Sequence, residues 1–283
     1  MIEVTPDVIH LIDLALAEDQ VANDATTNAL VGDQVSGVGT VYSKEEGILA
    51  GLHVAMAVFH RIDSSVRTKE LLKDGDSLEI GSAIAVVEGK ASTILKGERI
   101  ALNILQRMSG IATQTSLYVK AIYGSSAKIA DTRKTVPGFR LLDKYAVKAG
   151  GGHNHRMNLG DGILIKDNHI QILRDKGISL SDIVVQAMHN APHTLKIEVE
   201  VNNLVDLQEV LSTGADIILL DNMSSNDIRA AVQLVQGRVL LEASGGITLD
   251  NVGEIAETGV DLISVGALTH SVTALDINLD FVS

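Results

Sequence analysis

The stretch that decides the fold is ADTRKTVPGFRLLDKYAVKAGGGHNHRMNLGDGILIKDNHI, residues 130–170. Basic side chains recur along it near glycines and turn residues, although the whole chain carries a net charge of −13. A cationic, glycine-rich segment suits a small, strongly anionic ligand held by side chains and backbone N–H groups. The residues concerned are Arg133, Lys134, Arg140, Lys144, Lys148, His153, His155, Arg156 and Lys166.

Short apolar runs alternate with amphipathic helical patterns from residue 127 onward. The runs fall at 127–130, 162–165, 195–201, 217–220, 239–243 and 262–265, and helical patterns fall at 203–213, 225–236 and 249–258. Strands that alternate with helices form parallel βαβ units. We therefore predict an α/β protein with a barrel-like or incomplete (β/α) barrel of parallel strands.

The first ~90 residues have a different texture. Helical patterns cover 6–18 and 52–61, whereas 35–50 and 73–91 alternate with glycine breaks, as short strands and hairpins do. This predicts a small α+β unit. A long helical pattern over 92–123 follows, and Ser109-Gly110 in its middle predicts a break that would suit a joint between two domains.

Four residues at or just past the ends of strand-like runs are evenly spaced. Glu200, Asp221, Ser244 and Gly266 follow one another at intervals of 21, 23 and 22 residues, which is one βα unit each time. We expect them on one rim of the barrel, at the carboxyl ends of the strands, where such folds carry their chemistry.

The other rim candidates each have a plainer interpretation. Lys166 ends an apolar run and either snorkels or faces a polar pocket, and we favour the pocket. Glu198 and Glu200 share one face of their strand, so they face either the barrel interior or a wet sheet edge. The cationic turn at 131–135 could equally be a solvated turn. The glycines at 150–152 could form a flexible loop, but we favour a structural reason, such as close approach of the backbone to an anion.

Two glycine loops resemble the phosphate sites of barrels. Ser244-Gly245-Gly246 and Val265-Gly266-Ala267 each follow a strand-like run, where backbone N–H groups and a helix N-terminus can cradle a phosphate. Either loop alone is weak support, but adjacent loops support each other. Together with the cations and the two acids, they predict a site for a phosphorylated sugar and a second anion, with Mg²⁺ near the carboxylates.

Composition and missing motifs exclude several classes. The acidic balance (pI ≈ 5.0) and the 2% aromatic content argue against nucleic-acid and anionic-membrane partners. The chain has no cysteine, which excludes disulfides and thiolate nucleophiles. It also lacks P-loop, dinucleotide-binding and HExxH patterns. The short apolar runs and the acidic N-terminus predict a cytoplasmic protein.

The residues resemble the quinolinate phosphoribosyltransferase family, also called nicotinate-nucleotide pyrophosphorylase (carboxylating). The likeness rests on the opening stretch and on five further motifs: ERIALNILQRMSGIAT (98–113), IEVEV (197–201), LLDN (219–222), EASGGI (242–247) and SVGALTHS (264–271). It implies an N-terminal α/β sandwich domain at 1–110, on which a C-terminal tail at 271–283 packs, and an α/β barrel catalytic domain at 111–270.

The resemblance also implies an activity. Enzymes of this family join quinolinate to 5-phosphoribosyl 1-diphosphate with Mg²⁺, and release pyrophosphate, CO₂ and nicotinate mononucleotide, a precursor of NAD. It further implies a homodimer or higher homo-oligomer with shared active sites.

Roles carried over from the family motifs fall on specific positions. Arg99 would reach the quinolinate of the neighbouring subunit, and Lys134, Lys166, Glu200 and Asp221 would be catalytic. Glu200 and Asp221 would also contact the ribose hydroxyls and Mg²⁺. The remaining predicted substrate-binding residues are Thr132, Arg133, His155, Arg156, Ser244, Gly245, Gly246 and Gly266.

Two alternatives stay open at this point. One is a molybdenum-transport-linked paralogue of the same fold, which lacks the KDNH run found here at 166–169. The other is a non-catalytic phosphate-binding barrel, which would be expected to lack some of the cations or carboxylates.

Overall fold

The computed structural model describes residues 2–32 and 34–281. The chain divides into two compact units. Unit 1 holds Met1–Ser116, Thr135–Gly151 and Leu268–Ser283, and unit 2 holds Leu117–Lys134 and Gly152–Ala267. The domain bounds expected from the sequence stay a prediction.

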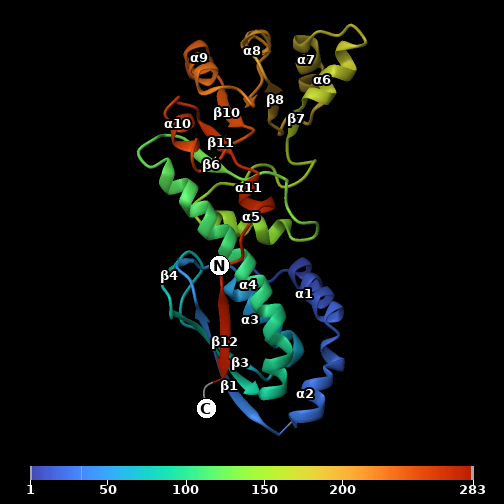
Figure 1. Cartoon of the computed structure of the whole chain (residues 1–283). Helices are drawn as coiled ribbons and strands as arrows, with labels where there is room; N and C mark the ends of the chain where they lie inside the picture. The colour runs from blue at the N-terminus through green and yellow to red at the C-terminus, as the bar shows by residue number, and fades with distance from the viewer. Residues whose placement is uncertain (1, 33, 282–283) are drawn as a thin grey trace. The chain divides into compact units, whose positions relative to one another are not determined.

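Unit 1 is built on an antiparallel sheet of four strands in the order β12-β1-β5-β3. The C-terminal strand β12 lies beside β1, with Leu279 opposite Val41, so the end of the chain completes a sheet made from its beginning (Figure 1). The elements are α1 (Pro6–Glu18), a 3-10 turn (Val21–Asn23), α2 (Ala25–Leu30), β1 (Ser36–Ser43), β2 (Gly47–Ile48), α3 (Leu52–Ile62), β3 (Arg67–Glu70), β4 (Ser77–Leu78), β5 (Ala83–Lys90), the first part of α4 (Ala91–Ala121), α5 (Arg140–Ala149) and β12 (Ile277–Phe281).

Helix α3 supplies much of the core of unit 1. It contacts α1 and β3, and Leu52, Val54 and Phe59 are almost wholly inaccessible to solvent. The broad apolar face expected for α1 is only partly used, because Val8 and Ile12 are buried while Ile9 and Leu14 stay exposed. The expected α+β character of this region is thus observed.

The long helix α4 is continuous, so the break predicted at Ser109-Gly110 is wrong. The Ser109 hydroxyl bonds with both the N–H and the carbonyl of Ala50, at 3.1 and 3.3 Å. A Cβ at Gly110 would collide with the carbonyl of Thr273. The two small residues therefore serve close packing, whereas the sequence pattern had indicated a joint.

Unit 2 is built on six parallel strands in the order β6-β11-β10-β9-β8-β7. Strands β6 and β7 lie at opposite edges, so the barrel is incomplete, as predicted, and helices lie along the outside of the strands (Figure 1). The elements are β6 (Lys128–Ala130), β7 (Ile163–Ile165), α6 (Asp167–Arg174), α7 (Leu180–Asn190), β8 (Ile197–Val201), α8 (Leu204–Val210), β9 (Ile217–Asp221), α9 (Ser225–Val235), β10 (Leu240–Ser244), α10 (Val252–Ala256), β11 (Leu262–Ser264) and α11 (Ala267–His270), which ends in unit 1.

The loop that contains the three glycines continues the sheet beyond β6. His153 forms an isolated parallel bridge with Ala130. Its N–H donates to the carbonyl of Ile129 at 2.8 Å, and its carbonyl accepts the N–H of Asp131 at 3.0 Å. This backbone pairing fixes the residues that follow, which include His155 and Arg156.

Side-chain oxygens set where the helices of unit 2 begin. Ser179, Asn203 and Ser224 accept backbone N–H groups in the first turns of α7, α8 and α9. The helix predicted from 249 begins only at Val252, because Thr248 donates its N–H to the Asn251 side chain and forms a turn first. Within the described residues, no helix is long and apolar enough to cross a membrane.

Candidate active site

Acidic and hydroxyl side chains share one face of the parallel sheet near its strand ends. Glu200 of β8 lies level with Leu219 of β9, which lies level with Glu242 of β10. Two residues further along, Asp221 lies level with Ser244. Side chains two positions apart in a strand share a face. The alternate residues, such as Val199, Ile218 and Ala243, are wholly buried and apolar.

A cavity of about 330 Å³ lies over this polar face. Nine of the predicted site residues line it: Thr132, Arg133, Lys134, His155, Arg156, Lys166, Glu200, Asp221 and Ser244. The sequence did not predict four further lining residues, which are Leu164, Leu219, Glu242 and Ser264. The structure thus brings together in unit 2 residues that are more than 100 positions apart in the chain.

Two arginines, Arg133 and Arg156, line one side of the cavity, and their positive charges repel each other. Burial lowers the pKa of Arg156, and the neighbouring positive charge of Arg133 lowers it further. The buried Nε of Arg133 has no hydrogen-bond partner among the described residues. Arg156 donates through Nη1 to the carbonyl of Gly162 at 3.1 Å. Two partly buried guanidiniums in this state are suited to receive a ligand with two negative groups.

Two lysines lie at strand ends on the same rim. Lys134 donates its backbone N–H to the hydroxyl of Thr132 at 3.1 Å, which shapes the turn that follows β6. Lys166 follows β7 directly and precedes α6, and its backbone N–H donates to Nδ1 of His169 at 3.0 Å. His169 therefore has a structural role at the start of α6. Both lysine side chains are exposed.

Glu200 and Asp221 form the acidic side of the cavity. Burial raises the pKa of Glu200, and the charge of Asp221 raises it further, while Lys166 acts in the opposite direction. Two neighbouring carboxylates that repel each other attract a cation, whether a metal ion or developing positive charge on a ligand.

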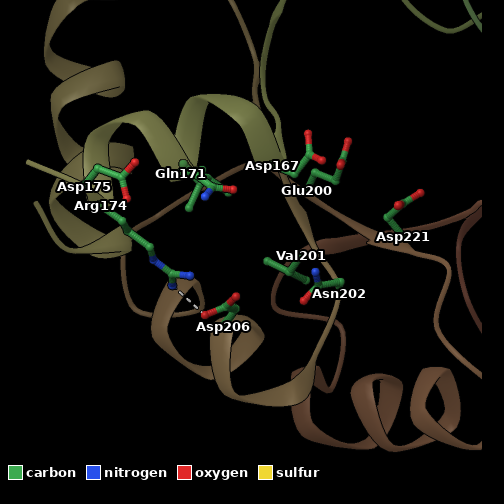
Figure 2. A pocket seen from close by; sticks show the side chains of 10 residues that line it. Asp167, Gln171, Arg174, Asp175, Glu200, Val201, Asn202, Asp206 and Asp221 are labelled. Atoms are coloured by element: carbon green, nitrogen blue, oxygen red, sulfur yellow. Dashed lines mark hydrogen bonds and ion pairs between the residues drawn. The ribbon is translucent and has the colours of Figure 1, made fainter.

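A second cavity, of about 340 Å³, adjoins these two acids (Figure 2). Asp167, Asn202 and Asp206 also line it, and Arg174 on its far side donates to Asp206 at 2.6 Å. The carboxylates of Asp167 and Glu200 point the same way in Figure 2. Glu200 and Asp221 thus line both cavities. The first also has four Arg and Lys side chains in its lining, and the second has three further carboxylates.

The predicted glycine loop after β10 has an unusual backbone. Gly245 and Gly246 both have left-handed φ angles, of 86° and 62°. A Cβ at Gly245 would also collide with the side chain of Asn222. Glycine is thus required there for backbone reasons. Gly245 and Gly246, and Gly266 after β11, are not among the residues that line the 330 Å³ cavity of unit 2.

A buried polar layer also meets the cavity. His155 Nε2 lies 3.0 Å from Glu198 Oε2 and 3.6 Å from Glu242 Oε1. From the sequence, Glu198 could face either the barrel interior or a wet sheet edge, and the structure places it in the interior. Glu242 was not predicted as a site residue. The signal was present, since a glutamate in the apolar run VLLEA is costly unless something pairs with it.

Arg99 lies in the other unit. It is on α4, and its side chain is exposed. Its predicted role across a subunit interface stays a prediction, as do the individual roles of the cavity residues.

Comparison with protein families identifies both parts of the chain. Residues 24–109 match the description "Quinolinate phosphoribosyl transferase, N-terminal domain", and residues 111–280 match the corresponding C-terminal domain. The chain belongs to the quinolinate phosphoribosyltransferase family.

Curated relatives and solved structures agree with this placement. The chain is 43% identical over 270 residues to a probable nicotinate-nucleotide pyrophosphorylase [carboxylating] of Bacillus subtilis, covering 95% of this chain and 92% of the relative. It is 42% identical over 291 residues to quinolinate phosphoribosyltransferase [decarboxylating] 1b of Nicotiana tabacum, covering 97% and 82%.

Among solved structures, NadC from Streptococcus pyogenes has a TM-score of 0.93 at 39% identity, and covers all of both chains. The nicotinate-nucleotide pyrophosphorylase from Francisella tularensis has a TM-score of 0.91 at 39% identity, covering 98% of each. The chain is thus a member of a pentosyltransferase enzyme family, and the predicted combination of antiparallel and parallel α/β parts is confirmed.

Proposed function

We propose that the protein transfers the phosphoribosyl group of 5-phosphoribosyl 1-diphosphate to quinolinate, and yields nicotinate mononucleotide, pyrophosphate and CO₂ for NAD biosynthesis. One observation carries the proposal: a single cavity of unit 2 places four cationic side chains opposite two carboxylates, Glu200 and Asp221. A reaction between a dicarboxylate and a sugar diphosphate needs both kinds of group at once.

Arg133 and Arg156 are the groups best suited to quinolinate. Each guanidinium can take one carboxylate in a bidentate fashion, and the bound dianion would offset the repulsion between them. The unpartnered N–H of Arg133 supports this assignment. The two arginines would thereby orient the ring nitrogen toward the sugar.

Glu200 and Asp221 would act on the ribose. Displacement at the anomeric carbon proceeds through a loose, cationic transition state, and two nearby carboxylates stabilise that positive charge. Lys134 and Lys166 would stabilise the departing diphosphate. Once the ring nitrogen carries the ribose it is cationic. The bond between the adjacent ring carbon and its carboxylate then breaks, CO₂ leaves, and the electron pair left on that carbon, stabilised by the neighbouring cationic nitrogen, takes a proton from water. No protein nucleophile is required.

The two acids also fit a magnesium ion. Mg²⁺ is commonly held by one or two carboxylates together with substrate phosphates, and Glu200 and Asp221 offer such a pair beside a cavity large enough for a diphosphate. When bound, the ion would supply charge neutralisation of the diphosphate. Backbone N–H groups of the Ser244–Gly246 loop would bind the 5-phosphate, because the left-handed glycines form a concave backbone.

The test is a reconstituted reaction. Purified protein with quinolinate, 5-phosphoribosyl 1-diphosphate and Mg²⁺ should release equal amounts of nicotinate mononucleotide, pyrophosphate and CO₂. Nicotinate, with one carboxylate, should be a much poorer substrate, because one arginine would stay unpaired. Binding of the diphosphate without any product would contradict the proposal and favour a non-catalytic phosphate-binding barrel.

A homodimer with shared sites forms a second part of the proposal. Arg99 and Leu95 lie one helical turn apart on the same face of α4, and both are exposed, a combination that suits a subunit interface. Arg99 would complete the quinolinate site of the partner subunit.

Mixing two inactive variants tests this arrangement. Arg99→Ala and Lys166→Ala should each be inactive, and hybrid dimers formed from equal amounts should recover about a quarter of the active sites. Proven subunit exchange without recovered activity would contradict cross-subunit completion. A cytoplasmic location is also proposed, and it is consistent with a chain that contains no cysteine.

A further inference from the structure

Three residues other than glycine have left-handed φ angles in the part of the chain that the structure describes. Gln20 and Gln236, at 48° and 51°, lie at the C-terminal ends of α1 and α9, where a left-handed residue commonly ends a helix. Asn222, at 53°, instead follows strand β9 directly. Asparagine tolerates this conformation better than most side chains, but no helix end explains why the chain adopts it here.

The side chain of Asn222 bonds to the acid that precedes it. Its Nδ2 donates to Asp221 Oδ2 at 2.7 Å. Asp221 is half-buried and lines both cavities of the site, whereas Asn222 is not among the described residues that line either one. The amide therefore bonds to the acid from outside the two cavities. A charge-assisted hydrogen bond of this kind holds a carboxylate in one orientation.

The backbone of Asn222 is tied to the neighbouring strand. Its N–H donates to the carbonyl of Ser244 at 2.8 Å, which extends the pairing of β9 with β10 one residue beyond Asp221. The Asn222 amide also lies so close to Gly245 that a Cβ there would collide with it. One residue thus contacts both the acid proposed to act on the ribose and the loop proposed to bind the 5-phosphate.

The left-handed backbone makes the two sets of contacts compatible. Side chains of an extended strand alternate between its faces, so a residue after Asp221 in extended conformation would share the apolar face of Leu220, which is fully buried. The left-handed φ of Asn222 interrupts that alternation. Its amide can therefore reach Asp221 while its N–H still pairs with the next strand.

We propose that Asn222 is a positioning residue that sets the distance between Asp221 and the Ser244–Gly246 loop, and so matches the site to a five-carbon sugar phosphate. The ribose hydroxyls and the 5-phosphate of 5-phosphoribosyl 1-diphosphate lie at a limited separation. A site whose acid and phosphate loop are held at that separation binds both ends at once. The inference rests on the proposed function, since the acid and the loop matter through this substrate.

Binding without turnover provides the first test. Titration calorimetry on the full-length protein would measure the affinity for 5-phosphoribosyl 1-diphosphate with Mg²⁺ and, separately, for quinolinate alone. Asn222→Gly keeps the left-handed backbone and removes the amide. We expect it to weaken binding of the diphosphate roughly tenfold and to leave quinolinate binding within about twofold, because one charge-assisted hydrogen bond is lost at the ribose side only. An unchanged affinity for the diphosphate, or an equal loss for both ligands, would overturn the proposal.

Gln236 provides the matched control, because it is left-handed, exposed and in the same unit as Asn222. Gln236→Gly should change neither affinity. Alanine at the two positions tests the backbone link, since a left-handed alanine is strained. Asn222→Ala should weaken binding of the diphosphate more than Asn222→Gly does, whereas Gln236→Ala should lower only the melting temperature. Equal losses in the two Asn222 variants would show that the link to Ser244 does not set the distance, against the proposal.

A double-mutant cycle tests whether the amide acts through Asp221. If Asn222 works by orienting that acid, removal of the acid should remove most of the effect of Asn222. With Asp221→Ala already present, we expect Asn222→Gly to weaken binding of the diphosphate by less than about twofold. A similar loss in both backgrounds would show that Asn222 contacts the ligand itself, and the positioning role would be wrong. These affinities need no turnover, so a wild-type protein that binds the diphosphate but forms no product would contradict the proposed reaction and not this inference.

Discussion

Two arginines of this protein, one in each unit, show how the same side chain serves two purposes. In unit 1, Arg107 donates to both oxygens of the fully buried Asp143, at 2.9 and 2.8 Å, and also to the carbonyl of Thr269. In unit 2, Arg156 lies near Arg133, and the pKa of Arg156 is lowered by burial and by that neighbour.

The difference concerns what satisfies the charge. Arg107 has its counter-charge, Asp143, within the chain, so removal of Asp143 would leave a partly buried positive charge uncompensated. Arg133 and Arg156 together carry more positive charge than their partners in the folded chain offset. The pair therefore still attracts an anion. In this protein, a strongly paired buried charge thus has a structural role, whereas like charges that lie together are found at the proposed ligand site. Four substitutions would sharpen or break this comparison.

The largest expected effect is on activity, from Arg133→Ala. We expect kcat/KM for quinolinate to fall roughly 10²- to 10³-fold, or ~3–4 kcal/mol, because a preorganised donor is lost. The melting temperature should hold or rise, since the repulsion with Arg156 disappears. Arg229→Ala, on α9 of the same unit, is the matched control and should leave kcat/KM unchanged. A marked loss of stability in Arg133→Ala would break the comparison.

The next largest effect is on folding, from Asp143→Ala. Arg107 would lose its carboxylate, and we expect the free energy of unfolding to fall by about 3 kcal/mol. Denaturant titration would measure it. The control is Asp13→Ala, which removes the carboxylate of an exposed ion pair with Arg61 and should cost no more than about 1 kcal/mol. Equal losses in the two variants would show that burial of the pair has no consequence.

A smaller effect is expected from Gly245→Ala in the predicted phosphate loop. The left-handed φ of 86° costs an alanine about 1–2 kcal/mol, and the added methyl group would also push against Asn222. Gly237→Ala separates the two causes, because its φ is 73° and no atom lies within 4 Å of the added Cβ. KM for 5-phosphoribosyl 1-diphosphate should rise only in the first variant.

The smallest effect is expected from Tyr145→Phe in unit 1. The Tyr145 hydroxyl donates to Asp74 at 2.7 Å, and burial together with this bond raises the pKa of Tyr145. Losing the bond should lower the free energy of unfolding by about 1 kcal/mol, with no change in activity. Tyr123→Phe is the control, since that side chain is 95% exposed and should show no change.

Much of unit 2 could be predicted because the strand ends of parallel βα units recur at a nearly constant interval in the sequence. The intervals between Glu200, Asp221 and Ser244 located one rim, and the structure places all three on one cavity. The same reasoning failed at Ser109-Gly110, where small residues serve contacts with chain segments 59 to 163 positions away, which no local pattern contains.

The site was predictable only where residues repeat a spacing or gather in one stretch. Glu242 contacts His155 across the barrel interior, and this pairing depends on strand register, which the sequence alone does not show.

The bridge between His153 and Ala130 has a consequence for how this enzyme can change. By occupying the exposed hydrogen-bonding side of β6, the loop shields a sheet edge that would otherwise invite pairing with another chain. The same loop carries Arg156. Insertions or deletions there would therefore uncover an aggregation-prone sheet edge and displace Arg156, so we expect variation in this loop to occur by side-chain exchange at constant length.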